Sequence, residues 1–514
     1  MRGVVAAGHP LTAKAGADVL REGGNAVDAA VAAVLASFAV ESPLTGLGAG
    51  GFMLVHSASE QPTLVDFFVQ APGLGGTERR SELVPIEILF DETPQVFNVG
   101  AASCGVPGTP AGLAHALQRF GSAPLSDLVR AGRELAWDGA PLNAQQAYIH
   151  RLLEPILTHY EECRRLYAPN GRALKEGETF RFRELAEALD LYGAEGPDPF
   201  YSGEVGTAMA DHIAELGGTL SREDMSAYQA VERRPAWASF RGAEVLTNPP
   251  PSSGGILIAL CLELLERLGS CGVEETVAVM RVAQESRDER FQEGLYEEDF
   301  LAMFLDPERL AEVAARLRES LGGDGPEPGD VVGSTTHLSV MDSEGMCASV
   351  TCSNGTGSGL VVPGTGVHVN NMLGEQDLNP FGFHRTPAGR RMPSMMAPTV
   401  VIRDGQVIAG LGSGGSNRIR SAILQTILRI VADEMPVSDA VQAPRAHFED
   451  GIVQAEPGLD EAALARLEEK GLKVARWKRR NLYFGGVHAV ARDPASGALQ
   501  GGGDPRRGGA VVVI

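Results

Sequence analysis

Cysteine is scarce in this chain: there are six in 514 residues, and no two of them form a CxxC pair. Most of the six stand among apolar neighbours, which is typical of reduced thiols and not of a disulfide framework. Cys347 and Cys352 are five residues apart on one predicted strand, so we expect their side chains to point to opposite faces of that strand. The sequence therefore favours free thiols.

Motifs for metal and nucleotide chemistry are missing as well. The chain has no HExxH, no GxxxxGK[ST] and no EF-hand loop, and its eleven histidines are scattered. No serine stands at the centre of a GxSxG, which excludes a nucleophile elbow. We expect chemistry that needs no metal ion or other cofactor.

The chain also has few long apolar runs and fewer basic than acidic residues. The nearly all-apolar helix predicted at residues 26–40 is shorter than the roughly 20 residues of a membrane span, so we expect a core helix and no membrane span. Lys and Arg number 44 against 66 Asp and Glu, and a net charge of -22 argues against a nucleic-acid partner. Residues 1–16 lack the apolar run of a signal peptide, so we expect a cytoplasmic protein.

The sequence does contain a pair of threonines, Thr335 and Thr336, between a connector rich in helix and strand breakers and two predicted strands. The connector, LGGDGPEPGD at 321–330, favours turns. The strands, near residues 337–342 and 346–353, are joined by a turn that begins with Asp and ends with Gly. If the bond before Thr335 is cut, the freed α-amine can activate the hydroxyl of the same residue as a nucleophile. From this segment alone, a plain β-branched strand opening is the competing interpretation.

Further motifs accompany the threonine pair. They are TTHLSV with the D..G turn, then GSG, PGTG and NN, and elsewhere GGNAVDAAVAA, GLGAGGFMLV, VPGTPAGL, DMSAYQAVERR and NPPPSSGGI. Together they resemble the gamma-glutamyltranspeptidase family of N-terminal-nucleophile hydrolases, over nearly the whole chain. The resemblance implies an α+β fold, the four-layer αββα sandwich, in one domain over residues 1–514. It also implies self-cleavage between Ser334 and Thr335 into associated fragments 1–334 and 335–514, with Thr335 as the nucleophile.

A glycine-rich loop follows the hairpin predicted at residues 399–411, in which an Asp-Gly turn joins two apolar strands. The backbone N–H groups of Gly415 and Ser416 should point outward at the start of the next helix, where negative charge is favoured. The resemblance assigns this pair to the oxyanion hole. The loop also satisfies GxGxxG, but a dinucleotide site needs a second strand that ends in an acid, whereas the next acids here follow a helix. A loop that serves only tight packing is the other alternative.

The resemblance also marks a substrate pocket, part of which this chain retains. Ser353 stands where the family has a threonine near the amine of the nucleophile, and Asn354 matches its pocket asparagine. Glu375 takes the place of an aspartate that binds the α-amine of the donor. Ser394 is the first member of an expected serine pair.

Three replacements in the same pocket remove polar groups. Phe68 stands where the family's DFRE motif has an arginine for the α-carboxylate of the donor, and an aromatic ring cannot make that charged contact. Met372 replaces a glutamine or glutamate, and Met395 replaces the second serine. One hypothesis is that Arg390 or Arg391 supplies a replacement cation from another direction.

Three functions follow from these residues. The first is a gamma-glutamyltransferase or glutathione hydrolase for a small-molecule amide or peptide, and the second is an acylase for another acyl group, favoured by the apolar replacements. The third is an uncleaved binding protein, against which Thr335 and the glycine loop argue. His337 shares a face with Thr335, but a structural histidine is favoured because the α-amine already supplies a base. The donor, the acceptor, hydrolysis or transfer, and the oligomeric state, including a homo-oligomer, stay open.

Overall fold

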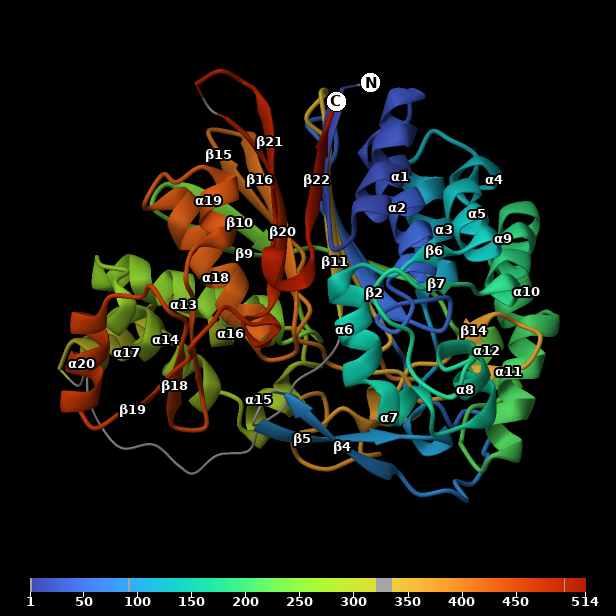
Figure 1. Cartoon of the computed structure of the whole chain (residues 1–514). Helices are drawn as coiled ribbons and strands as arrows, with labels where there is room; N and C mark the ends of the chain where they lie inside the picture. Colours follow the sequence, from blue (N-terminus) through green and yellow to red (C-terminus); the bar gives the residue numbers. More distant parts are fainter. Residues whose placement is uncertain (1, 91–92, 320–334, 494) are drawn as a thin grey trace.

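Two antiparallel sheets packed face to face form the centre of the molecule (Figure 1). The computed structural model describes residues 2–90, 93–319, 335–493 and 495–514. The predicted connector at 321–330 and the predicted cleavage bond between Ser334 and Thr335 lie outside these ranges.

The first sheet has seven strands among the described residues, and its neighbouring strands are antiparallel. In spatial order they are β22 (Ala510–Val513), β1 (Gly3–Ala7), β11 (Thr336–Asp342), β12 (Cys347–Ser353), β2 (Gly50–His56), β3 (Thr63–Phe67) and β8 (Val231–Arg233). The two strands predicted after Thr335 are therefore present as β11 and β12, at the centre of the sheet.

The second sheet has six antiparallel strands within the described part of the chain. In spatial order they are β21 (Leu499–Gly503), β20 (Gly486–Arg492), β16 (Gln406–Gly414), β15 (Thr399–Arg403), β10 (Ala243–Thr247) and β9 (Ala236–Phe240). The predicted hairpin is β15 and β16, and Asp404 and Gly405 in its turn have φ values of +51° and +75°. A type I′ turn requires positive φ at both central residues, which explains the Asp-Gly pair.

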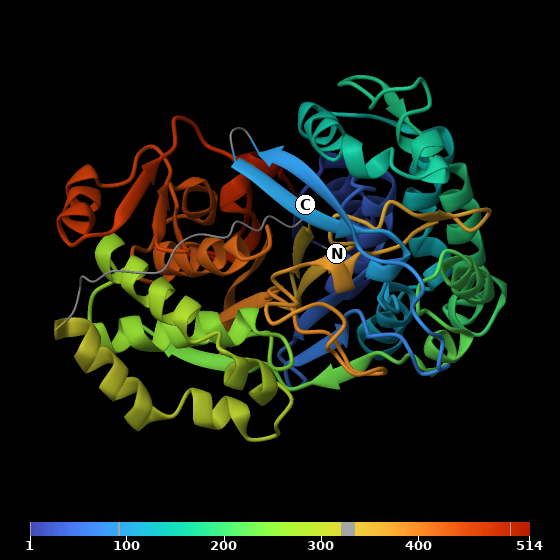
Figure 2. The same ribbon diagram turned by 90° about the horizontal axis from the view of Figure 1, so that it is seen from below.

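Helices cover the outer face of each sheet and complete four layers (Figures 1 and 2). Beside the seven-stranded sheet lie α1 (Pro10–Arg21), α2 (Ala26–Val40), α3 (Thr109–Phe120), α5 (Arg130–Asp138) and α9 (Arg183–Glu195). Beside the six-stranded sheet lie α13 (Gly254–Leu268), α14 (Val273–Glu285), α17 (Pro307–Glu319), α18 (Arg418–Val431) and α19 (Val437–Gln442). The predicted α+β fold, a four-layer αββα sandwich, is confirmed.

Shorter elements surround the four layers. The helices are α4 (Leu125–Leu128), α6 (Ala144–Leu152), α7 (Glu154–Leu157), α8 (Glu161–Tyr167), α10 (Asp198–Tyr201), α11 (Glu204–Glu215), α12 (Arg222–Ala227), α15 (Glu289–Gly294), α16 (Phe300–Phe304) and α20 (Glu461–Glu469). The strands are β4 (Val84–Phe90), β5 (Thr93–Val99), β6 (Ala140–Pro141), β7 (Thr179–Phe180), β13 (Val361–Val362), β14 (Val367–His368), β17 (Ala446–Glu449), β18 (Ile452–Ala455) and β19 (Lys473–Arg476). The hairpin of β4 and β5 projects along the lower side of the molecule in Figure 1.

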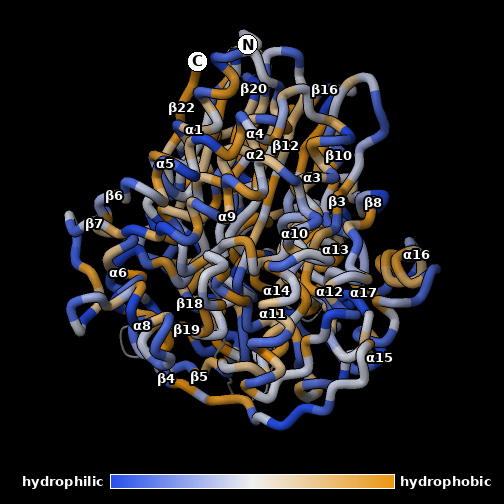
Figure 3. The backbone as a smooth tube through the Cα atoms, turned by 90° about the vertical axis from the view of Figure 1, so that its right-hand side faces the viewer, coloured by the Kyte–Doolittle hydropathy of each residue, from blue (hydrophilic) through white to orange (hydrophobic). Residues whose placement is uncertain are grey.

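Side-chain alternation along the strands builds two apolar cores. Val5 and Ala7 of β1 join the core under α2, whereas Val4 and Ala6 join the core between the two sheets. Figure 3 shows hydrophobic residues along the strands, β22 among them. Strands apolar on both faces are what a sheet needs when another sheet covers one side and helices cover the other.

Helix α2 is the core helix that its composition predicts, and every residue in it is buried. Asn25 caps it by accepting from the amides of Val27 and Asp28, and the Asp28 carboxylate accepts from the Asn25 amide, which completes a capping box. In the part of the chain that the structure describes, no helix is long and apolar enough to cross a membrane.

All six cysteines carry free thiols. On β12, Cys347 packs in the core between the sheets and Cys352 in the core under α2, so the predicted placement on opposite faces is confirmed.

Candidate active site

Thr335 lies at the entrance to β11, between the two sheets, with 6% of its surface exposed. Its hydroxyl donates a hydrogen bond to Ser353 Oγ at 3.3 Å, and its carbonyl accepts one from Arg507 Nη1 at 3.1 Å. Gly414 of β16 packs against the same carbonyl, where a Cβ atom would come within 2.1 Å of the oxygen. The predicted nucleophile is therefore fixed by contacts from β12, β16 and the C-terminal segment.

A cavity of about 30 Å³ opens beside Thr335. It is lined by Phe68, Thr335, Ser353, Gly355, Met372, Glu375, Asp377, Leu378, Ser394, Met395, Met396, Ser416 and Ile419. All the predicted site residues except Gly415 and Asn354 are in this set, so segments far apart in the sequence meet at one place. Their substrate-binding roles remain predictions.

Most of the cavity wall is apolar. Phe68 is fully buried and stacks on Phe52, with ring centroids 5.3 Å apart. The cavity is small, and the unbranched side chains of Met372 and Met395 in its wall are flexible enough to adapt its shape to an acyl group.

The hypothesis that Arg390 or Arg391 serves this cavity is wrong, because both are engaged elsewhere. Arg391 donates to the backbone carbonyls of Phe68 and Gln229, each at 2.7 Å, and its Nε lies 3.3 Å from the Asp66 carboxylate. Arg390 lies over the Tyr296 ring, 4.5 Å from its centroid, in a separate surface groove of about 910 Å³. Arg391 thus holds the backbone of the Phe68 segment through the Phe68 carbonyl, and neither arginine lines the cavity.

Two buried carboxyl groups, Glu375 and Asp377, line the cavity together with the hydroxyl groups of Thr335, Ser353, Ser394 and Ser416. Glu375 accepts from the Thr356 amide at 3.1 Å, and Asp377 accepts from Ser416 Oγ at 2.5 Å. Burial, and then the charge of Asp377, raises the pKa of Glu375 above its usual value. Burial also raises the pKa of Asp377, against the lowering effects of the Ser416 hydrogen bond and the Arg287 charge.

The glycine loop lies where the sequence predicts, between β16 and α18. Ser416 lines the cavity with Thr335, and Gly415 precedes it with a φ of +128°. Among the residues that the structure describes, neither of these two amides donates a hydrogen bond. Amides placed in this way at a helix start can stabilise an oxyanion, and this role remains a prediction.

Glu41 and Arg507 are close to the predicted nucleophile, and the sequence analysis did not identify them. Glu41 accepts from Thr336 Oγ1 at 2.6 Å and from Thr12 Oγ1 at 2.8 Å. Burial raises the pKa of Glu41 and lowers that of Arg507 to about 10. A carboxyl directly after the apolar helix at 26–40 was a usable signal for Glu41, whereas no local pattern marks Arg507.

His337 and Asn354 lie close by without lining the cavity. His337 is satisfied by Thr351 Oγ1 and Ser339 Oγ, each at 2.9 Å, and burial lowers its pKa well below the usual value, which supports the structural interpretation. The side-chain amide of Asn354 lies beside Gly46 and has no hydrogen-bond partner within the described ranges, whereas its backbone N–H donates to the Leu44 carbonyl at 2.9 Å.

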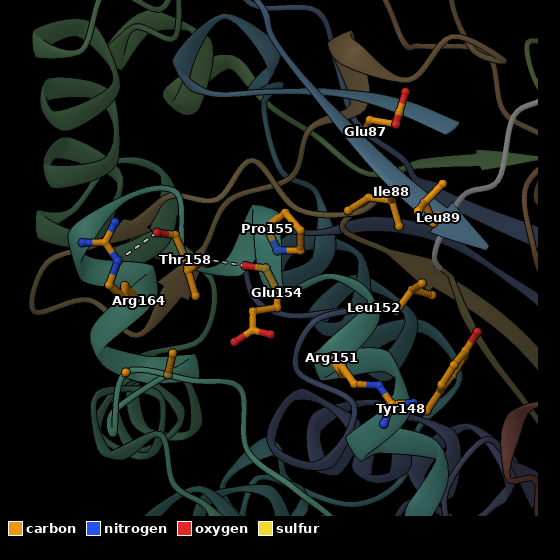
Figure 4. A pocket seen from close by; sticks show the side chains of 12 residues that line it. Glu87, Ile88, Leu89, Tyr148, Arg151, Leu152, Glu154, Pro155, Thr158 and Arg164 are labelled. Carbon is orange, nitrogen blue, oxygen red and sulfur yellow. Dashed lines mark hydrogen bonds between the residues drawn. The ribbon is translucent and has the colours of Figure 1, made fainter. Parts of the chain in front are cut away.

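A much larger cavity, of about 800 Å³, lies between the hairpin of β4 and β5 and helices α6 to α8 (Figure 4). It contains none of the predicted site residues, and the hydroxyl of Thr158 in its wall donates to the backbone carbonyl of Glu154 at 2.6 Å. In the described residues there is also no group of three or more His, Cys, Asp or Glu side chains placed to hold a metal ion. Size alone therefore does not locate the chemistry, and the cavity at Thr335 is the better candidate.

The chain is similar to known proteins along nearly its whole length. A family model described as Gamma-glutamyltranspeptidase matches residues 12–514. The Acylase ACY 1 proenzyme of Pseudomonas sp. (strain SE83) is 32% identical over 536 residues, covering 100% of this chain and 94% of that protein. The Glutathione hydrolase proenzyme of Bacillus subtilis (strain 168) is 29% identical over 554 residues, covering 100% and 91%. Among solved structures, cephalosporin acylase from Bacillus halodurans has a TM-score of 0.85 at 25% identity, covering 99% of this chain and 95% of that one.

Proposed function

This chain belongs to the gamma-glutamyltranspeptidase family, and we propose that it is a self-cleaving N-terminal threonine hydrolase that acts on small-molecule amides. Cleavage before Thr335 gives fragments 1–334 and 335–514. The fragments stay associated because each sheet contains strands from both: β1 pairs with β11 in one sheet, and β10 pairs with β15 in the other. Relatives whose names include the word proenzyme support this step.

In the proposed reaction, the freed α-amine of Thr335 takes the proton of Oγ1 as that oxygen attacks the amide carbonyl. The amides of Gly415 and Ser416 stabilise the oxyanion. The C–N bond then breaks, the amine leaves with the proton held by the α-ammonium, and an ester to Thr335 remains. Water or an acceptor amine attacks this ester and restores the free hydroxyl.

The acyl group that the geometry supports best is an uncharged or weakly polar one. The observation that carries this proposal is that no cationic side chain lines the cavity among the described residues, since Phe68 stands in the place of the family's arginine. A charge-assisted contact to a carboxylate contributes about 1.5 to 3 kcal/mol, so its loss weakens a carboxylate-bearing donor by about tenfold to a hundredfold. Two of the similar proteins are named acylases, which supports the same class.

A gamma-glutamyl donor is the second candidate, and Glu375 favours it. This carboxyl lines the cavity, where the resemblance places the group that binds the α-amine of the donor. The raised pKa of Glu375 weakens the case, because a protonated carboxyl does not pair with an ammonium group.

A panel of anilides tests the proposal. Mature protein should hydrolyse simple acyl anilides, such as butyryl and phenylacetyl, with a higher kcat/KM than the gamma-glutamyl anilide. Phe68→Arg should shift this ratio toward the gamma-glutamyl anilide by about tenfold or more, because it restores the charged contact. A wild-type protein that prefers the gamma-glutamyl anilide, with no shift on Phe68→Arg, would show that the cavity selects acyl groups by other contacts.

A further inference from the structure

The loop that carries the proposed oxyanion donors has a backbone conformation that needs support. Ser416 has a φ of +52°, in the left-handed region that non-glycine residues seldom adopt. A residue in this conformation persists when its surroundings hold it there. Two contacts hold the loop in this conformation: Asp377 binds the side chain of Ser416, and Arg287 binds the side chain of Asn417.

Asp377 holds Ser416 from the cavity side. The hydroxyl of Ser416 donates to Asp377 Oδ2 at 2.5 Å, and both residues are buried and line the cavity. A hydrogen bond to a carboxylate is stronger than one between neutral groups. The contact therefore fixes the side chain, and with it the backbone, of the residue that has the unfavourable φ.

Arg287 connects Asp377 to the next residue of the loop. Its Nη2 donates to the backbone carbonyl of Asp377 at 2.9 Å, and its Nη1 donates to Asn417 Oδ1 at 3.1 Å. The Asn417 amide group in turn donates to Glu449, at the end of β17. A planar guanidinium can fix two acceptors at once, which a lysine ammonium on a flexible stem does not do in the same geometry.

We propose that Asp377 and Arg287 are positioning residues for this loop. Acting through Ser416 and Asn417, they keep the loop amides directed at the carbonyl that the nucleophile attacks. The inference rests on the proposed function, because it takes the oxyanion of that reaction as the group to be stabilised. Neither residue has to touch the acyl group for this role.

Steady-state kinetics on an acyl anilide separate positioning from substrate contact. Asp377→Ala and Ser416→Ala should each lower kcat by about tenfold to a hundredfold with KM within about twofold, because the donors act in the transition state. Asp377→Asn keeps an oxygen that can accept from Ser416 and should stay within about fivefold of wild type. The kcat of Ser416→Gly should be higher than that of Ser416→Ala, because glycine adopts a positive φ without strain. If Asp377→Asn were as impaired as Asp377→Ala and KM rose in both, Asp377 would be a substrate contact and the proposal would fail.

Arg287 has a matched control in Arg420, a buried arginine whose pKa the charge of Asp377 affects. Arg420 donates to Gln284 Oε1 at 2.9 Å and makes no hydrogen bond to the loop. Arg287→Lys should lower kcat by about tenfold, whereas Arg420→Lys should stay within about twofold. Equal losses of kcat in Arg287→Lys and Arg420→Lys would overturn the positioning role of Arg287. If Arg287→Lys does not fold, the kcat and KM of the Ser416 and Asp377 variants test the proposal.

Hydrogen exchange of a peptide covering 412–418 gives a readout that needs no substrate. This peptide should exchange several-fold faster in Asp377→Ala, Ser416→Ala and Arg287→Lys than in wild type or Arg420→Lys. Unchanged exchange in all three variants would overturn the proposal. If wild type hydrolyses no anilide while the exchange shifts as expected, the proposed function fails and the two positioning contacts stand.

Discussion

Gly414→Ala is the change for which the structure gives the clearest magnitude. A Cβ atom on Gly414 would lie 2.1 Å from the carbonyl oxygen of Thr335, and real Cβ contacts are essentially never shorter than 3.0 Å. The carbonyl of Thr335, or β16 itself, must therefore move by about 0.9 Å, the difference between those two distances. The added Cβ atom would also lie 3.1 Å from Arg507 Nη1, so it crowds both partners of the hydrogen bond that this nitrogen donates to the Thr335 carbonyl. A misplacement of about 1 Å at a reacting group costs about a hundredfold in rate.

The assay measures the cleaved fraction on a denaturing gel and then kcat per mature enzyme on an acyl anilide. Gly414→Ala should mature slowly and turn over about a hundredfold more slowly. Gly46→Ala is the matched control, because a Cβ there would meet only Asn354 Nδ2, at an ordinary 3.5 Å. A folded and mature Gly414→Ala enzyme with kcat within twofold of wild type would refute the placement of Thr335 against β16.

Three further predictions concern the same site. Thr335→Ala should remain one chain on a denaturing gel and be inactive, whereas an active wild-type protein that is intact at this bond would contradict the mechanism. Gly415→Val should lower kcat by about a hundredfold, because valine cannot easily adopt the φ of +128° there; a fewfold change in a folded variant would assign the oxyanion to another group. Because burial raises the pKa of Glu375, the folded protein holds a proton that the unfolded chain releases, so stability falls as pH rises from the usual glutamate pKa to the raised one. Glu375→Gln should therefore show a smaller fall in Tm between about pH 5 and about pH 8 than wild type, and an equal fall would show that Glu375 is ionised.

Much of the fold could be predicted because local patterns and tertiary packing agree. The helix at residues 26–40 has a cap, an apolar surface all round and a breaker after it, and α2 has the same bounds. The hairpin of β15 and β16 was specified by one Asp-Gly turn. The motifs of the resemblance supplied the four-layer arrangement, which no single pattern could give.

The contacts that hold the predicted nucleophile in place could not be predicted, because they join charged side chains to residues far away in the sequence. Arg507 reaches the carbonyl of Thr335 across 172 positions of sequence, and Thr336 reaches Glu41 across 295. Periodicity reports only which face of an element is buried. The failure of the Arg391 hypothesis has the same origin: proximity in sequence to the pocket segment did not reveal that its guanidinium turns back toward Asp66.

The replacement at Phe68 and the raised pKa of Glu375 act in the same direction. Phe68 fills its position with a ring that stacks on Phe52, so this side of the cavity offers no cation. Glu375 is buried next to another carboxyl, and both effects raise its pKa. A protonated Glu375 donates a hydrogen bond instead of attracting an ammonium group. A cavity with an aromatic wall, flexible methionines and two carboxyl groups of raised pKa is suited to an acyl group that carries hydrogen-bonding groups and no carboxylate. The proposed preference for simple acyl anilides over a gamma-glutamyl anilide therefore rests on both residues together.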